Sequence, residues 1–196
     1  MTADGPEAIS IRTVAIIGAG QAGRSFAIRC LRAGFDVTLE DVMPSNLRRA
    51  EAEAKSEFDS IDPAQFTFSL ALTVEDAVRT ADLAIDFVPD ELESKLEIFS
   101  MLDRMAPPKT ILCTPTEALS ITDLASCVYR PDRSVALRNL SGHARSDADT
   151  PALTLLYPPS ASPATLDAVS AFLGALGATV TREVDQSTPM LVKNLR

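Results

Sequence analysis

The sequence predicts an α/β domain built on a doubly wound, mostly parallel sheet, and two features lead to this expectation. Short apolar runs, such as residues 14–17 and 83–87, alternate along the chain with longer amphipathic stretches, such as 44–58 and 91–105. The short runs are typical of strands buried on both faces, and the amphipathic stretches are typical of helices that cover them. Alternation of the two favours a parallel sheet with helices on both sides.

Taken in order, the elements form one domain, residues 11–196, after a flexible N-terminus, residues 1–10. We expect strands at 13–17, 37–40, 66–71, 83–87, 110–113, 134–140, 152–156 and 179–183, and helices at 22–33, 44–58, 74–80, 91–105 and 163–176. Gly34 is a suitable end for the first of these helices. A polar loop, 141–150, stands where a helix would join two parallel strands, so we expect an antiparallel C-terminal extension of the sheet.

Composition excludes several classes of function. The net charge of −9 and the pI of about 4.6 leave no basic stripe for a nucleic acid or an anionic membrane. Residues 1–10 contain two acids and no apolar core, and no apolar run approaches the roughly 20 residues of a membrane span. Three cysteines without CxxC spacing fit a reducing compartment, so we expect a cytoplasmic protein.

A glycine-rich motif follows the first predicted strand and opens the first predicted helix. It reads Gly18-Ala19-Gly20-Gln21-Ala22-Gly23. Gly18 would form the turn, Gly20 would let the backbone approach a pyrophosphate, and Gly23 would let the helix pack closely against its strand. The free N–H groups at the start of the helix would bind phosphate. The motif therefore predicts a dinucleotide site.

Asp41 ends the second predicted strand, 21 residues after Gly20. A carboxylate about 20 residues beyond the glycines binds the adenosine ribose hydroxyls in dinucleotide-binding domains. Glu40 beside it would repel a 2′-phosphate, so we expect NAD rather than NADP. Glycine triplets also occur by chance in loops, but the order of strand, glycines, helix, strand and acid favours a Rossmann-type NAD site.

Four segments of the chain together resemble a known family. They are VAIIGAGQAG, DLAIDFVPDELESKLEIFSMLD, TILCTPTEALSIT and ALGATVTREVDQSTPMLVKNLR. Over nearly its whole length the chain resembles the NAD-binding domain of the 3-hydroxyacyl-CoA dehydrogenases, oxidoreductases of fatty acid metabolism. The resemblance implies cofactor contacts at Gly18, Gly20, Gln21, Ala22, Gly23, Asp41, Asp90 and Lys95. A surface ion pair between Asp90 and Lys95 is the alternative interpretation of the last two.

The same resemblance places the family's catalytic positions on other residue types. The substrate-binding serine corresponds to Glu117, the catalytic histidine to Arg138 and the neighbouring asparagine to Ser141. A guanidinium stays protonated at neutral pH and cannot take a proton from an alcohol. Strand 152–157, which would carry the glutamate that orients the histidine, has no carboxylate. We therefore expect that the His/Glu dyad is not retained and that ordinary 3-hydroxyacyl-CoA oxidation does not occur.

Three hypotheses about function remain open. In an oxidoreductase with an altered site, Glu117 would be the base if it were desolvated, Arg138 would hold an anionic or carbonyl substrate, and His143 could swing into the site. In a non-catalytic NAD(H)-binding sensor, or a subunit of a larger assembly, Glu117 and Arg138 would pair and close the site. A purely structural role ranks last, because Asp41 has no evident folding reason to lie where it does.

Two parts of the family pattern are reduced or missing. The helical extension that holds coenzyme A after the second strand is shortened to one helix, and the C-terminal helical domain, which forms much of the family's dimer, has no counterpart in these residues. We therefore expect a homo-oligomer, such as a homodimer, or a separate partner subunit. No residue pattern indicates a metal site.

Overall fold

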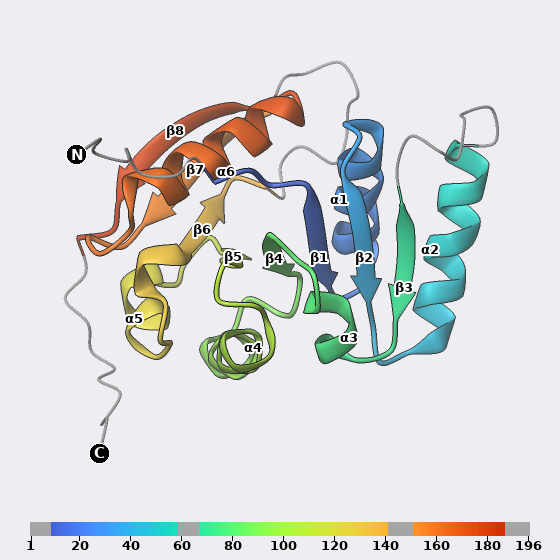
Figure 1. Ribbon diagram of the computed structural model, residues 1–196, viewed down its shortest axis with the longest axis horizontal. Helices are drawn as coiled ribbons and strands as arrows, with labels where there is room; N and C mark the ends of the chain where they lie inside the picture. The colour runs from blue at the N-terminus through green and yellow to red at the C-terminus, as the bar shows by residue number, and fades with distance from the viewer. Residues whose placement is uncertain (1–8, 59–66, 141–150, 187–196) are drawn as a thin grey trace, which may run out of the picture.

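The computed structural model describes residues 9–58, 67–140 and 151–186, which form an eight-stranded sheet with helices on both faces (Figure 1). The strand order is β3-β2-β1-β4-β5-β6-β7-β8. The strands are β1 (Thr13–Ile17), β2 (Asp36–Glu40), β3 (Phe68–Ala71), β4 (Leu83–Asp86), β5 (Ile111–Pro115), β6 (Ser134–Arg138), β7 (Ala152–Tyr157) and β8 (Thr179–Val184). From β3 to β6 all neighbours pair parallel, whereas β6 and β7 pair antiparallel.

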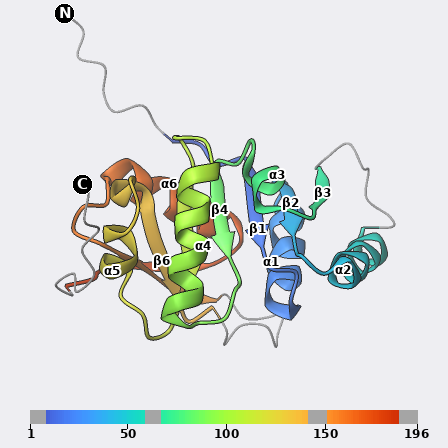
Figure 2. The ribbon, with the colours of Figure 1, turned by 90° about the horizontal axis from the view of Figure 1, so that it is seen from below.

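Six α-helices of the described residues cover the two faces of the sheet. They are α1 (Gln21–Arg32), α2 (Pro44–Glu57), α3 (Val74–Val78), α4 (Leu92–Met105), α5 (Ile121–Ser126) and α6 (Pro163–Ala175). Helices α1, α2 and α6 supply buried residues to one apolar core, and α3, α4 and α5 supply them to the other. Figure 2 shows α3, α4 and α5 on the face toward the viewer.

Strand β1 shows why the sheet needs both layers. Val14 and Ile16 are buried in the core beneath α1, whereas Ala15 and Ile17 are buried in the core beneath α3 and α4. Alternate side chains of a strand point to opposite faces, so a continuous apolar run requires cover on both sides. Four fully buried residues in a row therefore place β1 at the centre of the sheet, as its pairing with β2 and β4 shows.

The parallel strands bring the functional candidates to one edge of the sheet. The carboxyl ends of β1, β2, β4, β5 and β6 lie at the same edge because these strands run in one direction. The loops that follow them carry the glycine motif, Asp41, Asp90, Glu117 and Asn139 in turn. In open α/β sheets ligands bind at this edge, beside the point where the strand order reverses, which here is between β1 and β4.

The predicted fold class is confirmed, with corrections to individual elements. The short helix α5 was not predicted. The predicted antiparallel extension consists of β7 and β8, which pair parallel with each other and run opposite to the rest of the sheet, so that β6–β7 is its one antiparallel pair. Residues 1–8, the loop 141–150 and residues 187–196 lie outside the described residues. Among the helices that the structure describes, none has both the length and the apolar character needed to cross a membrane.

Candidate functional site

The glycine motif forms a tight turn between β1 and α1. Gly18 has a φ of +98°, a conformation that favours glycine, and its N–H donates to the carbonyl oxygen of Glu40 at 2.9 Å. A Cβ at Gly23 would overlap the carbonyl oxygen of Gly18, so only glycine lets α1 lie this close to the turn. A Cβ at Gly20 would meet no protein atom within 4 Å. The open space beside Gly20, at the N-terminus of α1, fits a pyrophosphate.

Asp41 is tied to the glycine motif by its side chain. Its Oδ2 accepts hydrogen bonds from the Ala19 N–H at 2.9 Å and from Asn46 Nδ2 at 3.0 Å, and its Oδ1 accepts one from the Met43 N–H at 2.8 Å. The expectation that Asp41 has no folding role is therefore wrong. A carboxylate has about four lone-pair sites, so a ribose hydroxyl can still be accommodated beside these three donors.

Glu40, the last residue of β2, is buried directly before Asp41. Only 3 % of the surface of Glu40 is exposed. Burial, together with the neighbouring charge of Asp41, raises the pKa of Glu40 to about 7, although the Gly18 N–H favours its charged form. The expected repulsion of a 2′-phosphate by Glu40 is therefore weakened, because this carboxyl is buried and is only partly ionised near neutral pH.

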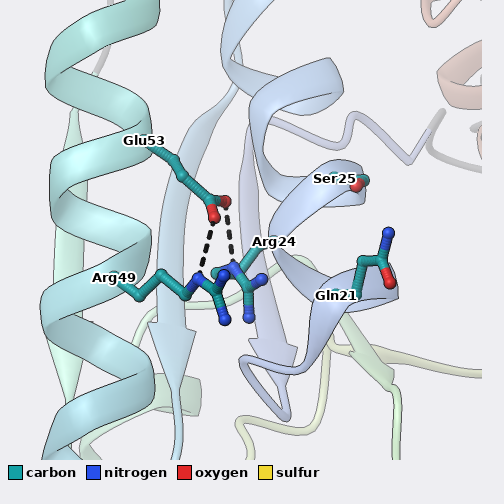
Figure 3. Close-up of a pocket in the computed structure, with 5 residues that line it drawn as sticks. All are labelled: Gln21, Arg24, Ser25, Arg49 and Glu53. Atoms are coloured by element: carbon teal, nitrogen blue, oxygen red, sulfur yellow. Dashed lines mark hydrogen bonds and ion pairs between the residues drawn. The ribbon is translucent and has the colours of Figure 1, made fainter.

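A polar cavity of about 440 Å³ lies between α1 and α2, next to the glycine motif (Figure 3). It is lined by Gln21, Arg24, Ser25, Arg49 and Glu53. Arg24 donates from Nε to Glu53 at 2.9 Å and from Nη1 to the carbonyl oxygen of Ala19 at 2.8 Å, and Arg49 lies 3.5 Å from the same carboxylate. Arg24 was not predicted as a residue of this site, although its position directly after Gly23 places it beside the glycine motif.

Lys95 and Asp86 form a buried ion pair beneath the carboxyl edge. Nζ of Lys95 lies 2.7 Å from Oδ1 of Asp86, and their side chains are 1 % and 0 % exposed. Burial raises the pKa of the Asp86 carboxyl, and the ammonium opposes this effect. The alternative of a surface ion pair between Asp90 and Lys95 is therefore wrong. Lys95 is buried, and its partner is Asp86, the last residue of β4.

Asp90 and Glu117 lie together at the exposed rim of the same edge. The Glu117 N–H donates to Oδ2 of Asp90 at 3.0 Å, and Oε1 of Glu117 accepts the Asn139 N–H at 2.9 Å. Both acids are exposed. The condition under which Glu117 would act as a base, desolvation of its carboxyl, is therefore not met in this structure.

Arg138, the last residue of β6, lies in a second cavity of about 360 Å³. Its guanidinium is 4.0 Å from Glu183 of β8, and its Nε is buried with no hydrogen-bond partner among the described residues. The expected pair with Glu117 is not formed. Strand β7 has no carboxylate, as the sequence indicates, and Glu183 supplies one from the next strand. That neighbour could not be found from sequence because it depends on the parallel pairing of β7 and β8.

The remaining candidates contribute little to the described site. His143 and Ser141 lie outside the described residues. Burial raises the pKa of the Cys30 and Cys113 thiols, which disfavours reactive thiolates there. In residues 9–58, 67–140 and 151–186, no group of three or more His, Cys, Asp or Glu side chains is arranged to hold a metal ion.

Comparison with known proteins identifies the family. The model of the 3-hydroxyacyl-CoA dehydrogenase NAD-binding domain matches residues 13–182. The chain belongs to this family. Its cofactor is accordingly NAD(H), and the glycine motif at the start of α1 has the geometry that this cofactor needs.

Individual relatives agree with this assignment. A probable 3-hydroxybutyryl-CoA dehydrogenase of Bacillus subtilis is 31% identical over 147 residues, which cover 66% of this chain and 48% of the relative. An L-carnitine dehydrogenase of Streptomyces griseus is 30% identical, over 68% of this chain and 43% of that protein. A solved diketoreductase structure superposes with a TM-score of 0.75 at 26% identity, covering 94% of this chain and 68% of its own. The chain thus spans about half the length of the curated relatives it matches.

Proposed function

We propose that the chain is the cofactor-binding part of an NAD(H)-dependent oxidoreductase in which Arg138 orients an anionic or carbonyl substrate. The observation that carries this proposal is the buried Nε of Arg138, which has no hydrogen-bond partner among the described residues and lies in a cavity lined also by Leu156 and residues 183–186. A buried donor without a partner costs free energy that a ligand oxygen would recover. Arginine is also suited to carboxylate and carbonyl oxygens because its planar guanidinium presents several donors at once.

The cofactor would be held mainly by main-chain groups. The N–H groups of Gly20, Gln21, Ala22 and Gly23 would face the pyrophosphate, and Asp41 would accept from the adenosine ribose. Asp90 would meet the cofactor from the loop after β4. Lys95, buried against Asp86, would support that loop from beneath.

When bound, NAD(H) exchanges a hydride with a substrate carbon. The accompanying proton needs a group that can both hold and release it near neutral pH, and a guanidinium cannot do so. We propose His143 for this role because histidine is the side chain best suited to it. Glu117 is the second candidate, provided that substrate binding removes water from its carboxyl.

A non-catalytic NAD(H)-binding sensor or subunit is the second proposed function. The pair of Glu117 with Arg138 that this function predicts is not formed, and the support for this function is that the Glu117 carboxyl is exposed and not desolvated as a catalytic base would need to be. In this case a second copy of the chain or a partner subunit would respond to whether NAD or NADH is bound. Light scattering would test the oligomer, and a strictly monomeric species would count against it.

The test of both proposals is a fluorescence titration with NADH followed by assay with acetoacetate and acetoacetyl-CoA. Gly20→Ala should remain folded, because its Cβ would meet no protein atom, and should lose NADH binding at least tenfold because that Cβ would fill the pyrophosphate space. Gly174→Ala, on α6 with equally open surroundings, is the matched control and should bind normally. NADH binding without turnover would favour the non-catalytic function, and absence of binding would refute both.

A further inference from the structure

Three loops at the carboxyl edge are joined by hydrogen bonds that pass through one residue, Glu117. Asp90 follows β4, Glu117 follows β5 and Asn139 follows β6. The backbone N–H of Glu117 donates to Oδ2 of Asp90 at 3.0 Å, and its side-chain Oε1 accepts the N–H of Asn139 at 2.9 Å. Glu117 is thereby connected through its backbone to the loop after β4, which carries Asp90, and through its carboxylate to the end of β6.

The segment that carries Glu117 is firmly held. Thr116 is buried, and its N–H donates to the carbonyl oxygen of Leu137 on β6 at 3.0 Å. The hydroxyl of Thr116 accepts the Leu119 N–H at 3.0 Å, which closes the turn after β5. These hydrogen bonds hold the Glu117 turn in place between Asp90 and Asn139.

Asn139 has a backbone conformation that needs support. Its φ is +64°, in the left-handed region, where asparagine is several-fold enriched among non-glycine residues. The Glu117 carboxylate accepts its N–H, and a charged acceptor makes a stronger hydrogen bond than a neutral one. Arg138 directly precedes this residue, so the direction of its side chain depends on the same turn.

We propose that Glu117 is a positioning residue that couples the cofactor to the Arg138 site. A cofactor that fixes Asp90 also fixes the turn formed by Arg138 and Asn139, and a ligand on Arg138 favours cofactor binding in return, because such coupling is reciprocal. The inference rests on the proposed function, in which Asp90 meets the cofactor. Asp90 is exposed, and one of its oxygens is sufficient for Glu117, so its carboxylate can take a second donor.

Amide hydrogen exchange at Asn139, measured by NMR with and without saturating NADH, tests the coupling. In the wild type, NADH should slow this exchange at least about fivefold, the lower end of usual coupling factors. Glu117→Ala should exchange faster without cofactor and gain no protection from NADH. Glu117→Gln should keep part of the protection because its amide oxygen can still accept. Equal protection by NADH in the wild type and in Glu117→Ala would overturn the proposal.

A cofactor-free comparison separates this proposal from the proposed function. If the wild type fails to bind NADH in a fluorescence titration of the same samples, the proposed function is refuted, but the link through Glu117 can still be tested. Asp90→Ala should then raise Asn139 exchange at least twofold, because the Glu117 turn loses its contact to the loop after β4. Unchanged Asn139 exchange in Asp90→Ala would overturn the coupling whether or not the cofactor binds.

Discussion

Replacing Lys95 by methionine should destabilise the fold strongly, because its ammonium is buried against a buried carboxylate. The two groups are 2.7 Å apart and their side chains are at most 1 % exposed. Removing one partner of a buried ion pair costs about 3–5 kcal/mol, since the other charge stays in an apolar environment. With a urea dependence of about 2 kcal/mol per M, the unfolding midpoint should fall by roughly 1.5–2.5 M.

The loss should depend on pH in a defined direction. Burial raises the pKa of Asp86, and without Lys95 the largest opposing influence on this pKa is lost. A carboxyl whose pKa is higher in the folded than in the unfolded state lowers stability above the unfolded pKa, and this cost fades as the pH falls toward that value. The difference between Lys95→Met and the wild type should therefore be smaller at pH 5 than at pH 8.

A double variant provides the control. Asp86→Leu combined with Lys95→Met removes both charges and should recover most of the loss, because an apolar pair of similar volume often replaces a buried ion pair without cost. The reasoning would be refuted if the single variant lost less than about 1 kcal/mol, or if the double variant were no more stable than the single one.

Three further outcomes are expected. Glu40→Gln should raise stability at pH 8 but not at pH 5 in urea unfolding, because the pKa of Glu40 is raised from 4.5 to about 7 and its ionisation costs stability above the unfolded value. Asp41→Ala should lose about 1–3 kcal/mol in the same assay, since its carboxylate accepts three hydrogen bonds; a loss below the experimental error would contradict this. In the native protein Cys127 should react with a thiol reagent well before Cys30 and Cys113, whose thiols are fully buried and have raised pKa values, and equal rates would contradict this.

The order of elements could be predicted from sequence because its signals are local. The run from β1 through the glycines to Asp41 contains a buried strand, a turn and a helix within 30 residues, and each signal depends on near neighbours. Helix α5 was missed because six residues are too few to show amphipathic periodicity. Its one local signal is Ser120, which accepts the Asp123 N–H as a helix cap.

The partners of the site residues could not be predicted, because they come from separate strands. Lys95 and Asp86 are nine residues apart, but only the packing of α4 on β4 shows that they meet in the interior. Arg138 and Glu183 are 45 residues apart and approach because β7 lies between their strands. The resemblance predicts which residues correspond to the family's catalytic positions, whereas the contacts of these residues depend on tertiary structure.

The basic residues Arg24, Lys95 and Arg138 differ in how far their side chains are already engaged by other groups of the protein. Arg24 is held by Glu53 and by the Ala19 carbonyl oxygen, and Lys95 is held by Asp86, so both are engaged within the protein. A pyrophosphate at the glycine motif would therefore rely on the N–H groups and dipole of α1, which do not change with pH. Arg138 is different, because within the described parts of the chain its nearest ion-pair carboxylate is 4.0 Å away and its Nε has no hydrogen-bond partner. Under the proposed function, selectivity for substrate charge should therefore depend on Arg138.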